Sequence, residues 1–522
     1  MFSGSNKPIY DFQCLYSITF WLHWHTLTVK YSYMYFDIKP IPELFSHLES
    51  VFETEFKFNK YEINFSLQLL RKFLGKLPQT LYVGIEYPYI DKLHRDTYYS
   101  YYSSKLASYH RDCIRLSFFK EEFILDEFHS SGGSQHLQDT YIGFLVLRPT
   151  PENVIGRNVF KPNADKKFKE CYSATAVIPS AVNGIKLTVE GFPHSSQDTE
   201  FIVCAETTLW AVMEYFSNRY AEYKPVLPKT IHRILAAATM QRQVPSSGLT
   251  VLQISFALKE LGFGVKLYSS ASGSASGMSL EEIVQVYVES GIPVLTAIQN
   301  SQGIGHVMNI IGRTTVDSYS VNIPISTFKS GKQIFSFYEK QAEYLTIDDN
   351  MIPYDSIPLN NPARNYTNQI WAGCTITGAV VPLYHKIYMD AERARELAIQ
   401  ALKAFDETFA ELPNLVLRVL LSSSRSFKHS ISMNRDLDSS IKILIVTLNM
   451  PKFVWIAEIG NVESFNDGQA TGMLLMDATE PRKTEILAYL LENMYIGTIN
   501  GKQSVYSLPL RPFSIHHNLK PF

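Results

Sequence analysis

Apolar and polar positions in the central part of the chain predict mainly helices first and strands afterwards. After an apolar run at residues 201–203, four apolar residues recur at helical spacing and predict a helix that starts near Cys204: Leu209, Val212, Met213 and Phe216. Capping residues and glycines predict two further helices, from Thr250 with Gln253 to Gly262 and from Ser279 with Glu282 to Gly291. Short apolar runs predict strands at residues 265–268, 294–298, 307–311, 316–321 and 344–347.

Weaker patterns on either side of this region predict flanking domains. Helices are expected at residues 41–53, 65–77, 391–409 and 484–493. Strands are expected at residues 27–36, 141–147, 174–178, 185–189, 441–447 and 453–459. The Ser/Gly run at residues 130–134 has the composition of a linker.

These patterns predict an α+β protein. We expect an N-terminal mixed α/β domain (residues 1–130) and a β-rich connecting segment (131–190). A central domain with a helical half followed by a β half (191–385) and a C-terminal α/β domain (386–522) complete the chain.

The composition argues against several classes of protein. Of the 522 residues, 46% are apolar and 19% are charged, which is unlike a disordered chain. The formal net charge of −2 gives no reason to expect nucleic acid as a partner. No apolar run is long enough to span a bilayer, and no secretory signal opens the chain, so we expect a cytoplasmic protein that does not enter a membrane.

Five cysteines are scattered along the chain: Cys14, Cys113, Cys171, Cys204 and Cys374. An odd number without Cys-x-x-Cys spacing argues against a disulfide framework and against a cysteine zinc site. Cys204 stands where an apolar run turns into a helix, and the peptide dipoles at a helix N-terminus stabilise a thiolate. An isolated cysteine is usually a small core residue, so Cys204 becomes a candidate nucleophile only in the company of other groups.

A histidine and two carboxylates, the groups that activate a thiol nucleophile and orient its base, follow Cys204 in the chain. His306 comes after the glycine-rich turn at residues 303–305 and opens the strand expected at 307–311. Asp348 and Asp349 end the strand expected at 344–347, so one of them can orient the imidazole from a neighbouring strand. Alternation along a strand does not decide between the two without a register.

This arrangement resembles the papain-like cysteine peptidases, and particularly the bacterial peptidases that cleave double-glycine leader peptides. The segments that carry the resemblance lie in the central third of the chain: residues 247–263, 305–312 and 345–350. The resemblance implies a papain-like fold for residues 191–385 and a peptidase or isopeptidase that acts on a protein or peptide without a metal or cofactor. Cys204 would attack the carbonyl and His306 would act as the base. Asp349, slightly favoured over Asp348, would orient His306, and Gln197 would help to stabilise the oxyanion.

Three departures from the family pattern keep a second hypothesis open. Glu206 stands close to Cys204, where the family has small residues, and an acid beside a thiolate opposes its ionisation. Gln197 lies one position further from Cys204 than is usual in the family. His306 and Asp349 are 43 residues apart, which requires an inserted hairpin near residues 326–343. The alternative is therefore a degenerate papain-fold binding or sensor module in a protein complex, with the flanking domains contacting the partner.

Overall fold

The computed structural model describes residues 34–522 except 131, 165–169, 199, 202, 240–248, 271–276, 317, 319–320, 322, 339–341, 407–413, 482–485, 492–493, 500–501 and 509. Cys14 and most of the strand expected at residues 27–36 lie outside this part. The secondary structure is mixed α+β, with several separate sheets. None of the described helices is long and apolar enough to cross a membrane.

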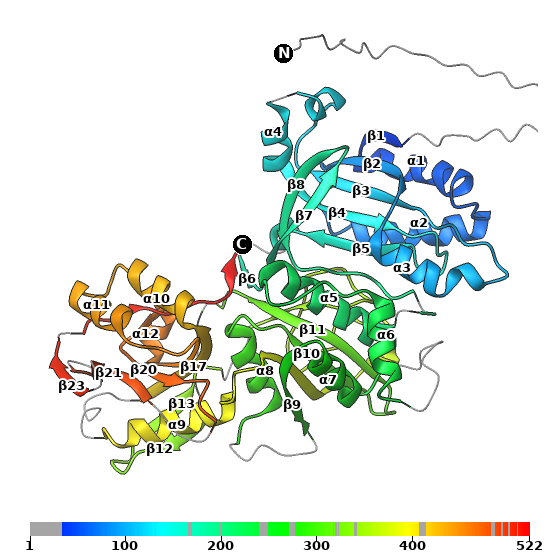
Figure 1. Ribbon diagram of the computed structural model, residues 1–522. Coiled ribbons are helices and arrows are strands. Elements are labelled where there is room, and N and C mark those ends of the chain that lie inside the picture. The colour runs from blue at the N-terminus through cyan, green and yellow to red at the C-terminus, as the bar shows by residue number, and fades with distance from the viewer. Residues whose placement is uncertain are drawn as a thin grey trace, which may run out of the picture.

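An antiparallel sheet with the strand order β1-β2-β3-β4-β5 forms the N-terminal part of the structure (Figure 1). Its strands are β1 (Tyr35–Pro40), β2 (Tyr82–Tyr89), β3 (Cys113–Phe119), β4 (Tyr141–Leu147) and β5 (Ile155–Phe160). The helices of this part are α1 (Ile41–Thr54), α2 (Lys60–Leu74), α3 (Lys92–Ser100) and α4 (Gly133–Thr140). Helices α1 and α2 pack on each other, and α1 also packs on β1 and β2.

This sheet runs across residue 130, where the sequence suggested a domain boundary. β4 and β5 were expected in a separate connecting segment, but β4 pairs with β3, placing Leu147 opposite Ile114. A Ser/Gly run marks a loop, and a loop inside one sheet has the same composition as a loop between domains. The hairpin of β7 (Ala176–Val182) and β8 (Ile185–Gly191) links this part to the next, because it contacts β4, β5 and the central helix α5.

The central sheet has the strand order β15-β14-β11-β10-β16-β9. Its strands are β9 (Phe263–Ser269), β10 (Val294–Gln299), β11 (Gly305–Thr314), β14 (Tyr344–Ile347), β15 (Asp355–Ile357) and β16 (Thr375–Tyr384). The accompanying helices are α5 (Cys204–Arg219), α6 (Pro228–Ala236), α7 (Val251–Glu260) and α8 (Leu280–Glu289). Helices α5 and α8 pack on β11, and α7 packs on β9 and β16. Residues 205–216 of α5 are all buried, because this helix lies between β11 and the β7–β8 hairpin.

The expected capping signals of this region are confirmed. Thr250 and Gln253 form a reciprocal capping box at the start of α7, and the Ser279 side chain accepts the N–H of Glu282 at the start of α8. Gly262 and Gly291 follow the two helices with φ of +99° and +75°, in the left-handed region that glycine enters without strain. Local chemistry alone therefore defines these helix ends.

The C-terminal sheet has the strand order β12-β13-β17-β18-β20-β21-β22-β23. Its strands are β12 (Pro324–Thr327), β13 (Gln333–Ser336), β17 (Leu415–Ser423), β18 (Phe453–Gly460), β20 (Gly472–Asp477), β21 (Ile486–Leu491), β22 (Met494–Ile499) and β23 (Lys502–Ser507). Its helices are α9 (Ala391–Lys403), α10 (Ser424–Met433), α11 (Ser439–Thr447) and α12 (Val462–Asn466). A two-stranded ladder joins β19 (Gln469–Ala470) to β24 (Phe513–Ser514).

The central and C-terminal parts exchange strands. The hairpin expected near residues 326–343 is present as β12 and β13, and β13 runs parallel to β17 of the C-terminal sheet. In the other direction, β25 (Lys520–Pro521) pairs with β6 (Cys171–Ser173), which itself pairs with β11. Residues 191–385 therefore do not form a sheet of their own.

Three expected elements are wrong. Residues 441–447 belong to helix α11, in which Asp438 caps the first turn and only Ile441 and Ile445, one helical turn apart, are buried. Residues 486–491 form strand β21 where a helix was expected, and the described residues among 316–321 are not in a strand. Short apolar runs do not distinguish helix from strand by periodicity, so packing decided these elements.

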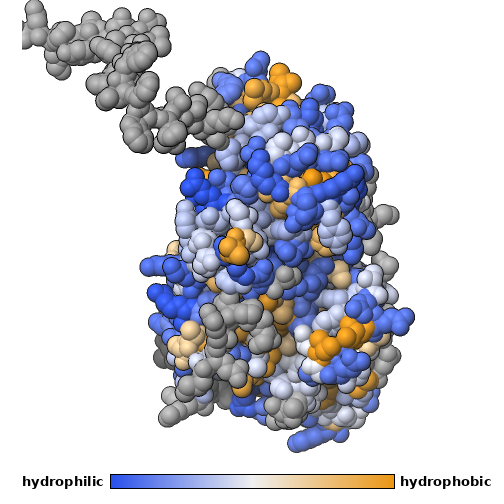
Figure 2. Space-filling model, turned by 90° about the vertical axis from the view of Figure 1, so that its right-hand side faces the viewer, coloured by the Kyte–Doolittle hydropathy of each residue, from blue (hydrophilic) through white to orange (hydrophobic). Residues whose placement is uncertain are grey.

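On the face drawn in Figure 2, hydrophobic residues form small patches separated by hydrophilic ones. Scattered patches of this size are normal for a folded protein surface.

Candidate active site

Cys204 is the first residue of helix α5. Val203 before it is extended and provides no side-chain cap, so the first N–H groups of the helix have no partners from the helix itself. Among the four cysteines of the described residues, Cys113, Cys171 and Cys374 are buried and Cys204 is partly exposed. The structure thus presents this thiol at a helix start with access to solvent.

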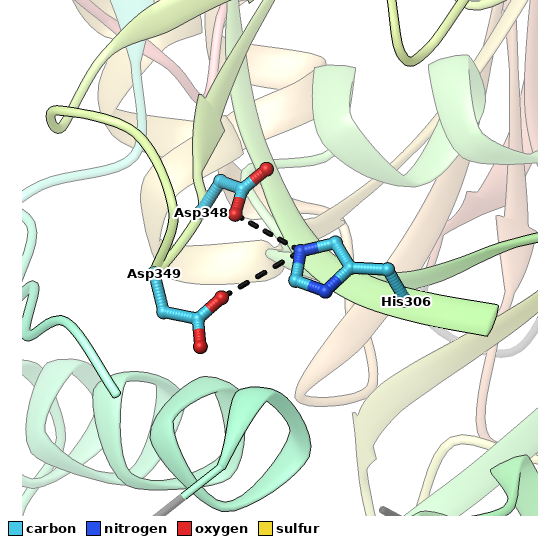
Figure 3. Close-up of side chains that lie close together, drawn as sticks. All are labelled: His306, Asp348 and Asp349. Atoms are coloured by element: carbon cyan, nitrogen blue, oxygen red, sulfur yellow. Dashed lines mark hydrogen bonds and ion pairs between the residues drawn. The ribbon is translucent and has the colours of Figure 1, made fainter. Parts of the chain in front are cut away.

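His306 is held on strand β11 beside Cys204. It lies opposite Ile298 of β10, and its side chain is only 4% exposed. The ring Nε2 donates a hydrogen bond to Asp348 Oδ1 at 2.9 Å, whereas Asp349 Oδ1 is 3.6 Å away (Figure 3). The ring nitrogen Nδ1 points away from both carboxylates (Figure 3).

The hydrogen-bonded carboxylate is Asp348, whereas the sequence slightly favoured Asp349. The pairing of β11 with β14 places Asn309 opposite Ile347, so Asp348 is the first residue beyond the paired strand. The Asp348 carboxylate also accepts the Tyr366 hydroxyl at 2.5 Å and the N–H of Asn350 at 3.0 Å. The charge and hydrogen bond of His306, together with these two donors, hold the pKa of Asp348 below its usual value against the opposite effect of burial.

The environment of His306 favours its protonated form. Burial acts to lower the pKa of the imidazole, but the charge and hydrogen bond of Asp348 outweigh it. A hydrogen bond to the Cys204 side chain and the charge of Asp349 act in the same direction, so the pKa of His306 lies well above its ordinary value. An imidazolium beside a thiol is the pairing that stabilises a reactive thiolate.

Asp349 is a second buried carboxyl group beside the pair. Burial raises its pKa to about 7, and the neighbouring Asp348 acts in the same direction. Its Oδ1 accepts a hydrogen bond from Asn350 Nδ2 at 3.3 Å, and its Oδ2 has no hydrogen-bond partner among the described residues. The protein therefore loses stability when Asp349 ionises.

Replacing Asp349 with asparagine should change the dependence of stability on pH. The folded pKa of about 7 lies above the usual 3.8, so the folded protein binds the extra proton and wild-type stability falls as pH rises between these values. Urea unfolding at pH 5 and at pH 8 measures the free energy of unfolding of both proteins. The value for D349N minus the value for wild type should be larger at pH 8 than at pH 5 by at least about 1 kcal/mol. An equal difference at both pH values would contradict the raised pKa.

In the part of the chain that the structure describes, His306, Asp348 and Asp349 also form a group that could hold a metal ion. One nitrogen and two carboxylate oxygens lie within 4.8 Å of one another, a donor set that suits a divalent transition metal. Such an ion would take Nε2, which here donates to Asp348. Metal binding and the hydrogen-bonded arrangement therefore exclude each other.

Gln197 lies beside the same thiol. Its side chain lines a cavity with Cys204 and His306, and its Nε2 donates to Asn350 Oδ1 at 3.0 Å. Its carbonyl accepts from the buried Arg148 at 3.1 Å. A primary amide has two N–H donors, so one remains for a ligand in the cavity.

Glu206 does not face the cavities. It lies two residues after Cys204 in α5, about 200° further around the helix. It is 1% exposed and is not among the described residues that line either cavity at Cys204. The helical geometry thus separates this acid from the thiol, although the two are close in sequence.

Two cavities meet at Cys204, Gly305 and His306. The larger, of about 930 Å³, has apolar walls from α7 and β10, including Val251, Leu252 and Ile298. The smaller, of about 400 Å³, has polar walls that include Gln197 and Asn350. A substrate can therefore approach the thiol from a polar side and an apolar side.

Several residues that build the site carried no local signal in the sequence. Tyr366 and Trp371 place their rings 6.0 Å from the His306 ring, from a loop that follows β15. His194 accepts from Asn158 at Nδ1 and donates from Nε2 to the Asp348 carbonyl at 2.9 Å. Burial lowers the pKa of His194 to about 4, which keeps it neutral for this role. Such contacts join separate segments of the chain, so no residue spacing in the sequence reveals them.

Comparison with known proteins adds no family to this geometry: no protein-family model and no curated protein matches the chain.

Proposed function

We propose that the protein is a papain-like thiol hydrolase, a peptidase or isopeptidase that cleaves amide bonds through Cys204. The observation that carries the proposal is that Cys204 and His306 line the same two cavities while Asp348 holds the far nitrogen of the imidazole. A nucleophile, a base and a group that orients the base are the parts that thiol catalysis needs. The order of helices α5–α7 before most of the central strands is also that of the papain fold.

Each residue has a definite role in this mechanism. The Cys204 thiolate adds to the carbonyl carbon of the substrate, and the imidazolium of His306 gives its proton to the departing amine as the C–N bond breaks. A water molecule then attacks the thioester while His306 takes a proton from it, which releases the acid and the thiol. Asp348 keeps the ring oriented throughout through its hydrogen bond to Nε2.

The oxyanion has two donors at hand. The N–H of Cys204 is the first of helix α5 and has no intrahelical partner. The second donor is the side-chain N–H of Gln197 that is not used by Asn350. Donors already in place stabilise the developing charge without reorganisation.

The binding-module alternative would leave Cys204 packed among apolar side chains and His306 directed elsewhere. Cys204 is partly exposed and contributes a hydrogen bond to His306. Glu206, the acidic residue that kept the binding-module hypothesis open, is not among the described residues that line either cavity. These features favour the enzyme.

A library of internally quenched peptides tests the proposal. We expect the native chain to cleave part of the library and the Cys204→Ala variant to cleave none of it. Gln197→Ala should slow cleavage about 100-fold because one oxyanion donor is lost. The matched control is Gln135→Ala, at an exposed position on α4, and it should leave the rate unchanged. Cleavage that survives in Cys204→Ala, or a library left intact by the native chain, would overturn the proposal.

A further inference from the structure

The smaller cavity beside Cys204 is built from two parts of the chain. Its walls carry the amide side chains of Gln197, Asn350, Asn365 and Asn368, and one wall comes from Lys72 of helix α2. Lys72 belongs to the N-terminal sheet and its helices, outside the segments that resemble peptidases. The N-terminal part therefore contributes directly to the surroundings of the thiol.

Packing holds helix α2 in place next to the site. Phe73, adjacent to Lys72, is buried and lies 6.3 Å, centre to centre, from the ring of His194. His194 in turn donates to the carbonyl of Asp348. Lys76, one turn after Lys72, forms an ion pair with Asp355 at 3.2 Å. These contacts fix the position of Lys72 relative to the segment 348–355, which contains Asp348.

The side chains that line this cavity favour an anion. No aspartate or glutamate is among its described lining residues, and Lys72 forms no ion pair with any residue of the described part. Asp355, which accepts from Asn365 at 2.6 Å, is already neutralised by Lys76. Asn365 already donates to Asp355 and to the Ser356 carbonyl, and the spare N–H of Gln197 serves the oxyanion. Asn368 and the second N–H of Asn350, beside the Lys72 ammonium group, are suitable donors for a carboxylate.

We infer that the smaller cavity is a subsite in which Lys72 and the amides of Asn350 and Asn368 bind a carboxylate of the substrate next to the scissile bond. This inference rests on the proposed hydrolase function and names its substrate class: peptides with an acidic side chain or a free terminal carboxylate at that position. The cavity volume of about 400 Å³ is large enough to hold a substrate side chain or a terminal residue.

Matched alkylating reagents test the subsite on the full chain without a known substrate. Chloroacetyl-glycine and chloroacetyl-glycinamide differ in one terminal carboxylate, and chloroacetyl-glutamate amide and chloroacetyl-glutamine amide differ in one side-chain carboxylate. Peptide mass spectrometry gives the rate at which each reagent alkylates Cys204. We expect the acid of at least one pair to react about tenfold faster than its amide at low salt, and the ratio to fall towards one in about 1 M NaCl.

Two variants distinguish the effect of Lys72 on the acid-to-amide rate ratio from the effect of other positive charges. Lys72→Glu should bring the acid-to-amide ratio to one or below, whereas Lys60→Glu, an equal charge change at an exposed position of the same helix, should leave it unchanged. The ratio is internal to each variant, so a partly misfolded protein lowers both rates together. The reagent pair whose acid reacts faster than its amide shows whether the subsite binds a side-chain or a terminal carboxylate.

The possible failures are distinguishable. If Cys204 reacts selectively but the ratio is the same in Lys72→Glu and wild type, or no acid reacts faster than its amide, the subsite is wrong and the hydrolase proposal stands. If Cys204 reacts no faster than the buried cysteines with every reagent, the hydrolase proposal fails and the subsite fails with it.

Discussion

Iodoacetamide should alkylate Cys204 at least about tenfold faster than Cys113, Cys171 or Cys374 at pH 6, and the His306→Ala variant should lose that advantage. Burial raises the pKa of Cys113 well above its usual value, that of Cys171 to about 11 and that of Cys374 in the same direction. Those thiols are therefore protonated as well as shielded. Cys204 is accessible and lies beside an imidazole whose raised pKa keeps it cationic at pH 6.

Peptide mass spectrometry over pH 5–9 measures this difference for each cysteine. His385→Ala, at an exposed position, is the control for the loss of a histidine and should retain the fast reaction. Asp348→Ala should weaken the advantage of Cys204 more than Asp349→Ala, because Asp348 makes the 2.9 Å hydrogen bond. If Cys204 reacts at pH 6 as slowly as the buried cysteines, the binding-module hypothesis replaces the hydrolase proposal.

Replacing Arg418 with methionine should lower the free energy of unfolding by about 3–5 kcal/mol. Arg418 on β17 has no exposed surface and donates to Glu458 at 2.6 Å, to Glu289 at 2.9 Å and to the His516 carbonyl at 2.9 Å. Methionine fills much of the space but leaves two buried carboxylates without this cation. Because Glu289 lies on α8 and Glu458 on β18, the loss should also weaken the joint between the central and C-terminal parts.

Guanidinium unfolding of the full chain measures this effect. Arg425→Met removes the same charge from an exposed position on α10 and should change stability by less than about 0.5 kcal/mol. Combining Arg418→Met with Glu458→Gln should cost less than the sum of the single changes, since the second change removes the charge of Glu458, whereas Glu289 keeps its ion pair with Arg313. A loss below about 1 kcal/mol for Arg418→Met would show that the buried network contributes little.

The sequence by itself determined the features that depend on neighbouring residues. The capping box at Thr250, the N-cap at Ser279, the glycines at 262 and 291, and the start of α9 at Ala391 were all predicted where the structure has them. Each depends on hydrogen bonds and backbone angles within a few residues, so the signal is complete in the local sequence. The order of Cys204, His306 and the two aspartates was also visible, because each stands at a predicted element boundary.

Only the tertiary structure decided the features that depend on register and packing. The β11–β14 pairing places Asp348 and not Asp349 on Nε2, and a shift of one residue would reverse the two. The apolar run at residues 441–447 became a helix, and the sheet of the N-terminal part continued across the Ser/Gly run at residue 130. Lys72, His194 and Tyr366 reached the site from distant segments. Their positions follow from contacts between elements far apart in the chain, and no local pattern encodes such contacts.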